Sequence, residues 1–281
     1  MSSTAAVATA LLTRSSIGER ALKFSAAVWW AVTFVGQWLF LYYVAGFYGR
    51  AIVTGHIENW NRNREIFKGF VPGDTAWNAY FGAHVLLASV IAFGGVLQLV
   101  PQIRRHAIAF HRWNGRAFML TALAGGITGL WMVLVRGVSV SGNGQLGVVA
   151  LTLDAALILA FAAIAWRRAY IGDVRNHRRW ALRLFMVANG VWFLRLGLFG
   201  WYALTGGAGL TNQLDGPVNF ILDFASYLLP LACLEFYLRA KDGESHGGKL
   251  TAAIVLLTCT AYMCVGIFVL TMDEWPLMPG L

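Results

Sequence analysis

The stretch LGVVALTLDAALILAFAAIAW, at residues 146–166, decides the fold class of this chain. Asp154 is the single ionisable residue in it. A bilayer core about 30 Å thick is crossed by about 20 apolar residues in an α-helix, which rises about 1.5 Å per residue. The stretch is therefore predicted to be a transmembrane helix.

Six further stretches of similar length and polarity flank it. Hydrophobic residues make up 58% of the 281 residues and charged residues 12%, with a mean hydropathy of +0.61, whereas soluble domains carry about 25% charged residues. The sequence thus predicts an all-α fold, a polytopic transmembrane helical bundle of about seven spans that forms a single integral membrane domain over residues 1–281. The predicted spans are 26–48, 79–100, 114–135, 146–166, 180–203, 218–238 and 250–271.

Two segments outside the spans have their own predicted roles. Residues 1–25 lack a signal-peptide cleavage pattern and are predicted to form a cytoplasmic tail. Residues 49–78 form a long predicted outer loop that mixes charged and aromatic residues. Long loops of this kind are often lids or docking surfaces, so we expect this loop either to close over the outer face or to bind a partner protein.

The distribution of Lys and Arg predicts the orientation in the membrane. With the amino terminus in the cytoplasm, 16 of the 22 Lys and Arg residues fall on the cytoplasmic side, five fall outside, and Arg195 lies within a span. By the positive-inside rule, this bias predicts a cytoplasmic amino terminus and an external carboxyl terminus in a bacterial inner (cytoplasmic) membrane. The net charge of +9 follows from this asymmetry and from attraction to anionic lipid, so nucleic acid is not an expected partner.

A seven-residue pattern occurs twice at predicted cytoplasmic ends of spans. WNGRAFM at 113–119 and WALRLFM at 180–186 share Trp, Arg, Phe and Met at the same spacing, with His111 and His177 just upstream. The repetition predicts a duplicated helical hairpin made of spans 2–3 and 4–5. The Trp and Arg residues are also ordinary interface anchors. The two His residues are candidates for paired ligands or for a proton relay at the inner face.

Ionisable residues occur inside four predicted spans at a similar distance from the outer surface. They are His84, Asp154, Arg195 and Asp223, roughly 8–12 Å deep at the helical rise. Because a charge in hydrocarbon costs at least about 2.5 kcal/mol, these residues are candidates for a functional site. We expect Arg195 to be the counter-ion of Asp154 or Asp223, with His84 beside them. An ion pair that only fixes the helix register is the alternative.

Other polar residues within the spans have simpler interpretations. Glu235 lies near the cytoplasmic end of the sixth span, at a depth where Arg183 or Arg116 can pair with it. The three cysteines all fall within spans and are expected to be small packing residues rather than disulfides or metal ligands: Cys233, Cys259 and Cys264.

Glycines occupy the outer half of the third span. Gly125 and Gly129 have the small-xxx-small spacing and lie at about the depth of His84. Such glycines usually let two helices approach closely. Alternatively, they make room for a flat group, such as a haem or quinone ring stacked beside His84.

The same motifs carry a family resemblance. The segments GAHVLLASVIAFGGVLQLVPQIRR (82–105), HRWNGRAFMLTALAGGITGLW (111–131) and GDVRNHRRWALRLFM (172–186), together with the sequences around Arg195 and Glu235, resemble the bacterial membrane-protein family known as domain of unknown function 2306. The resemblance implies a family-like core at residues 79–239 and leaves the first and seventh spans outside it. It implies a membrane fold but no reaction.

A b-type haem held by two imidazoles needs His residues on facing helices at one depth. The chain resembles the four-span cytochrome b561 architecture in having His residues near the ends of spans 2 to 5, but it lacks a His pair at each depth. His111 with His177 is the one pairing that suits two axial positions. His84 could serve one axial position of a second cofactor, or hydrogen-bond a quinone.

Two function classes remain, since the chain contains no Walker loop, no dinucleotide glycine fingerprint, no HExxH and no GxSxG motif. The first is a redox membrane protein that binds haem b or quinone and carries electrons or protons, with His84, His111 and His177 as haem iron ligands or proton carriers. In it, Arg195 and Asp223 would tune the charge at the cofactor site. The second is a non-catalytic membrane module, either a small-solute carrier or an accessory subunit of a larger membrane complex. Besides the lipid bilayer, the expected partners are other membrane subunits or further copies of the chain. Whether the protein is an enzyme stays open.

Overall fold

The computed structural model describes residues 3–62, 69–136 and 145–275, with the backbone alone for residues 3–16, 136, 273 and 274. Residues 63–68 of the predicted outer loop therefore lie outside the described part. The described residues are mostly helical and include no strand. The long helices are α1 (Ser3–Val44), α3 (Thr75–Gln98), α5 (Ile108–Arg136), α6 (Gln145–Tyr170), α7 (Val174–Ala188), α8 (Gly190–Thr205), α9 (Pro217–Asp242) and α10 (His246–Val269). The short elements are α2 (Arg50–Thr54), α4 (Pro101–His106), a 3₁₀-helix (Ile57–Arg62) and two π-helical turns (Ala45–Gly49 and Leu270–Glu274).

Six described helical segments are each long and apolar enough to cross a membrane. The bent pair of α7 and α8 meets the same criteria when taken together, and it adds a seventh span. These findings confirm the predicted all-α, polytopic fold of about seven spans. The duplicated hairpin remains a prediction.

The fifth predicted span is broken in the middle. The expectation of one continuous helix over 180–203 is wrong, because α7 and α8 are bent by 52° relative to each other. Asn189 lies at the break, where its Nδ2 donates to Phe185 O (2.7 Å) and its Oδ1 accepts from Gln37 Nε2 (2.8 Å). Asn favours helix ends and Gly is a poor helix former, so Asn189 followed by Gly190 interrupts the helix.

The first and second spans extend toward each other beyond their predicted ends. The first continues through a π-helical turn to Thr54, where Gly55 takes a φ of 77° and ends the helix. The second begins at Thr75 because the Asp74 carboxylate accepts a hydrogen bond from Trp77 N (2.9 Å). The connection between the two spans is therefore shorter than the predicted loop at 49–78.

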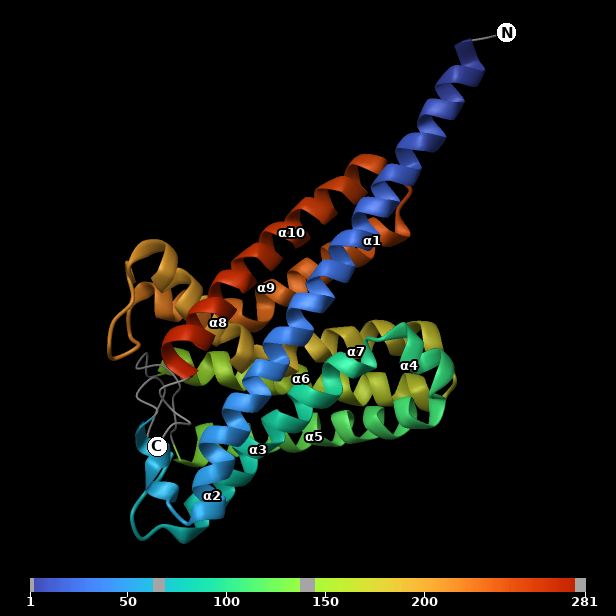
Figure 1. Ribbon diagram of the computed structural model, residues 1–281. Helices are drawn as coiled ribbons and strands as arrows, with labels where there is room; N and C mark the ends of the chain where they lie inside the picture. The colour runs from blue at the N-terminus through green and yellow to red at the C-terminus, as the bar shows by residue number, and fades with distance from the viewer. Residues whose placement is uncertain (1–2, 63–68, 137–144, 276–281) are drawn as a thin grey trace.

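The helices form a single bundle that α1 crosses as a long diagonal rod (Figure 1). α1 packs along both α10 and α3. α6 packs against α5 and α7, while α8 packs against α9 and α10. In Figure 1, α2 and the connection after α8 lie at one end of the bundle, and α4 lies at the other end.

Candidate functional site

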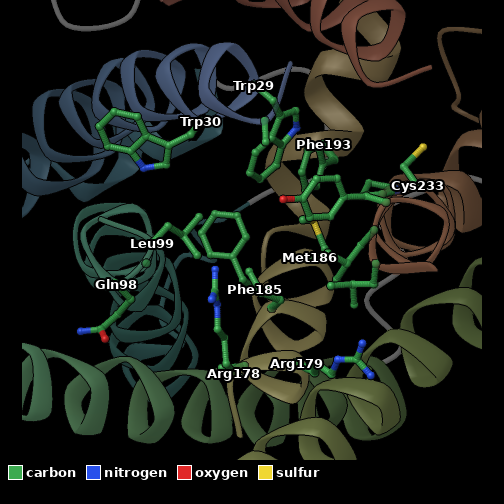
Figure 2. Close-up of a pocket in the computed structure, with 18 of the residues that line it drawn as sticks. Trp29, Trp30, Gln98, Leu99, Arg178, Arg179, Phe185, Met186, Phe193 and Cys233 are labelled. Atoms are coloured by element: carbon green, nitrogen blue, oxygen red, sulfur yellow. The ribbon is translucent and has the colours of Figure 1, made fainter. Parts of the chain in front are cut away.

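The bundle contains a cavity of about 1920 Å³, lined by α1 and by α3 through α10. Figure 2 shows Trp29 and Trp30 of α1 facing Leu99, which lies between α3 and α4, and Phe185 and Phe193 of α7 and α8. Aromatic and aliphatic side chains make up most of this wall. The cavity therefore suits an apolar or amphiphilic ligand.

Basic residues gather where the cavity meets α4 and the beginning of α7. They include Arg104, Arg116, Arg175, Arg178, Arg179 and Lys241. Arg179 pairs with Asp242, while Arg178 extends between Leu99 and Phe185 in Figure 2. Burial and the nearby guanidinium groups of Arg178 and Arg105 lower the pKa of Arg104. This end of the cavity therefore concentrates positive charge that favours an anionic group.

His111 and His177 line this same cavity. His177 Nδ1 lies 2.9 Å from Ala165 O, and because a carbonyl can only accept, Nδ1 carries a proton, which in the neutral tautomer leaves the lone pair on Nε2. His111 Nδ1 is buried with no hydrogen-bond partner among the described residues, and His111 O accepts from Gln98 Nε2 at 3.0 Å. The two imidazoles are close enough to interact electrostatically. Each ring can thus offer a nitrogen atom to a ligand.

The two copies of the repeated motif share one local geometry. The guanidinium carbon of Arg116 lies 5.0 Å from the ring centroid of Trp113, and that of Arg183 lies 4.6 Å from the ring centroid of Trp180. Arg183 also makes a two-point contact with Glu235, through Nε–Oε1 at 2.6 Å and Nη2–Oε2 at 3.0 Å. The predicted pairing of Glu235 is therefore confirmed for Arg183, and it joins α7 to α9.

His84 does not belong to the described lining of this cavity. Its Nδ1 lies 2.7 Å from Thr128 Oγ1, and that hydroxyl donates to Ala124 O at 2.7 Å. The two predicted glycines differ in their surroundings. A Cβ on Gly129 would lie 3.5 Å from His84 Cε1, whereas a Cβ on Gly125 would have no neighbour within 4 Å. Gly129 is thus the one of the two that faces His84.

The two predicted membrane acids are both near Tyr227 of α9. Asp154 and Asp223 each act electrostatically on the Tyr227 side chain, whose hydroxyl donates to Ala150 O at 3.1 Å. A Cβ on Gly190 would lie 2.9 Å from Asp154 Oδ2, so this carboxyl lies directly against the first residue of α8. The structure thus brings two members of the predicted polar layer together.

Arg195 lies elsewhere, buried at 5% exposure. Its Nη1 donates to Val191 O at 3.3 Å, and its guanidinium carbon is 5.6 Å from the ring centroid of Phe40 in α1. The expected ion pair with Asp154 or Asp223 is not among the ion pairs of the described residues. The physical reason is the direction of the Arg195 side chain, whose guanidinium lies toward α1 and not against α6 or α9.

Two contacts between helices were not predicted from the sequence. Gln37 and Asn189, 0% and 4% exposed, join α1 to the break between α7 and α8. A Gln in the middle of an apolar span was the available signal, because a buried amide needs partners. Cys233 Sγ and Cys259 Sγ lie 3.7 Å apart as free thiols on the cavity wall. Their spacing in the sequence gives no signal of this contact.

Residues 81–212 match the sequence family described as "Predicted membrane protein (DUF2306)". This match confirms the resemblance that the motifs predict, and it contains His84, His111, Asp154, His177 and Arg195. No curated protein and no solved structure matches the chain. The family description identifies a membrane protein and names no reaction.

Proposed function

We propose that this membrane protein binds a redox cofactor, a b-type haem, at the basic end of the cavity, where His111 and His177 would hold it. The observation that carries the proposal is that both imidazoles line one cavity and can each offer a ring nitrogen. A bound haem would supply one-electron transfer. The residues of the chain would hold it, orient it and exclude water.

The chemical parts of a haem fit the residues around the His pair. The porphyrin faces are apolar and suit walls such as Trp29 and Phe185. The propionates are anionic and suit arginines such as Arg178, whose planar guanidinium binds carboxylates in two-point contacts. The hydrogen bond from His177 Nδ1 to Ala165 O would fix the ring while Nε2 binds iron.

His84 belongs to a separate part of the proposal. It lies beside Gly129 and is held by Thr128, so it could bind a second haem or a quinone ring. Electrons or protons would then pass between this position and the inner cavity, with Asp154 and Asp223 as acids near the route.

A second candidate function is favoured by the extent of the cavity. Its lining continues from the arginines to Trp201 and Tyr262, which are far along the bundle from α4. Such a length suits an amphiphile with an anionic head and a long apolar tail. The protein would then be a carrier, or an accessory subunit that presents such a molecule to other membrane subunits or to a second copy.

The orientation that accompanies either function follows from charge. The basic end of the cavity would face the cytoplasm of a bacterial inner membrane, because basic residues are retained on that side. This end contains the repeated Trp and Arg motif, whose side chains suit the interface.

The visible absorption spectrum of the detergent-purified protein, before and after dithionite, tests the haem proposal. We expect a reduced-minus-oxidised haem b spectrum with about one haem per chain at the His111–His177 pair. His111→Ala and His177→Ala should each remove most of this signal. The matched control is His56→Ala, because His56 is exposed and paired with Glu58.

Haem-free protein from haem-replete cells would contradict the proposal, as would full haem content in both His variants. Lipid or quinone recovered in stoichiometric amounts from such haem-free protein would instead support the carrier function. A signal lost from all three variants would mean that these positions do not act as ligands.

A further inference from the structure

The break between α7 and α8 brings the ends of two helices inside the membrane next to Asp154. Gly190 is the first residue of α8, and it allows the close approach, since any Cβ there would lie 2.9 Å from Asp154 Oδ2. Broken helices in membranes commonly mark binding sites, because their ends carry unpaired backbone groups and partial charges. A helix end alone does not identify a ligand, so the side chains decide.

Asp154 is a partly exposed acid with one buried, unsatisfied oxygen. Its Oδ1 is shielded from solvent and has no hydrogen-bond partner among the described residues. The helix α9 packs against α6. Its titratable groups near Asp154 are Tyr227 and Asp223, and neither is a cation. On α8 the charged group is Arg195, whose contacts are Val191 O and Phe40.

The helices α5 and α7 also pack against α6. The charged residues of α7 are the arginines near its first turns and Arg183, which is paired with Glu235, and α7 also carries the titratable His177. Those of α5 whose side chains are described are the arginines near its first turns. No described basic side chain forms an ion pair with Asp154.

A second observation at the break comes from α1. Gln37 is fully buried, and its Nε2 donates to Asn189 Oδ1. Gln37 Oε1 is buried with no donor among the described residues. Two acceptor atoms, Asp154 Oδ1 and Gln37 Oε1, are thus left unsatisfied beside the consecutive residues Asn189 and Gly190. Neither acceptor atom has a donor among the described residues, and a protonated carboxyl is itself a hydrogen-bond donor.

We propose that Asp154 is a proton-binding site at the break between α7 and α8. The carboxylate binds one proton to form the neutral acid, with no change in oxidation state. Apolar surroundings, with no ion-pair partner among the described residues, favour the neutral acid, while the peptide N–H groups at the start of α8 favour the carboxylate. These opposed effects make the proton exchangeable. The site does not depend on a bound haem.

Infrared difference spectroscopy on the full-length protein in membranes tests this site. Wild type minus Asp154→Asn should contain the C=O stretch of a protonated carboxyl, displaced in D₂O and lost reversibly at alkaline pH. Gly190→Ala should shift this band, because its methyl group moves against the carboxyl. The matched control is Glu235→Gln, because Glu235 pairs with Arg183, and this variant should leave the band in place.

If the Asp154→Asn variant keeps the C=O band of a protonated carboxyl, the proposal is overturned. It is also overturned if, at every pH, the variant lacks only an ionised-carboxylate band of the wild type. If Asp154→Asn fails to fold, the Gly190→Ala comparison decides, because that variant keeps the acid. An unshifted band in folded Gly190→Ala would assign the proton elsewhere. None of these outcomes depends on haem content, so the haem proposal can fail independently.

Discussion

Arg183 divides its guanidinium between an aromatic ring and a carboxylate. Its planar face covers Trp180, and its N–H edge meets both oxygens of Glu235. These contacts are compatible because cation–π attraction uses the face and charge-assisted hydrogen bonds use the edge. Arg116 repeats the first contact with Trp113. The repeated motif therefore has a structural role in addition to any role as an interface anchor.

The Arg183–Glu235 contact leads to a double-mutant prediction. Removing one partner leaves a partly buried charge, so Arg183→Leu or Glu235→Leu should each lower stability by about 1–3 kcal/mol. The double variant should recover part of that loss. Thermal unfolding in detergent measures these differences. Arg116→Leu is the matched control, since Arg116 repeats the ring contact, and its loss should be smaller. Additive losses in the double variant would contradict the coupling.

Sequence reasoning at the residue scale succeeded where depth alone decides a contact. Glu235 and Arg183 fall at one depth near one surface, so their pairing could be predicted. The partner of Arg195 could not, because depth does not say on which side of a helix a neighbour lies. In the structure Arg195 is directed to Phe40, while Asp154 lies against Gly190.

At the scale of elements, hydropathy predicted where the spans lie but not where one of them breaks. A window of about 20 residues averages over Asn189 and Gly190, so one polar side chain and one glycine do not lower the signal enough. The break depends on the amide of Asn189 and on Gln37 from another helix. Such a contact between distant residues is not visible in local periodicity.

The crossing of α8 and α10 depends on a glycine that the sequence did not single out. A Cβ on Gly266 would lie 2.7 Å from Leu196 O and 3.0 Å from Leu196 Cα, so the two backbones touch there. Backbone atoms cannot turn aside as a side chain can. Close approach of this kind is the usual reason for small residues between membrane helices.

A pair of glycine substitutions tests this crossing. Gly266→Ala should lower stability by about 1–3 kcal/mol, because the added methyl separates α8 from α10. Gly125→Ala is the matched control in another helix, since its Cβ would have no neighbour within 4 Å. It should be neutral or stabilising by up to about 1 kcal/mol, as Ala favours helix. Unfolding temperatures in one detergent compare the two, and equal losses would argue against a tight crossing.

The number of spans is a property of the whole molecule, because it depends on whether α7 and α8 together cross the bilayer. In Figure 1 the connection after α8 lies at the end of the bundle that contains α2, away from α4. This arrangement supports a crossing and seven spans. A re-entrant pair would return the chain to the side from which α7 starts. A crossing pair and a re-entrant pair therefore place every later segment on opposite sides of the membrane.

Alkaline phosphatase, which is active only outside the cytoplasm, tests the crossing and the orientation together. With a cytoplasmic amino terminus and a crossing pair, insertions at Gly73 and Gly209 and a fusion after Leu281 should be active, and an insertion at Gly243 should not. A re-entrant pair would leave Gly73 active but reverse the other three results. Inversion of the whole protein would make Gly73 inactive as well, so the Gly73 insertion separates the two failures. Activity of the enzyme inserted at Gly243 therefore has two possible meanings. If the Gly73 insertion is inactive, the basic end of the cavity lies outside the cytoplasm. If the Gly73 insertion is active, α7 and α8 form a re-entrant pair.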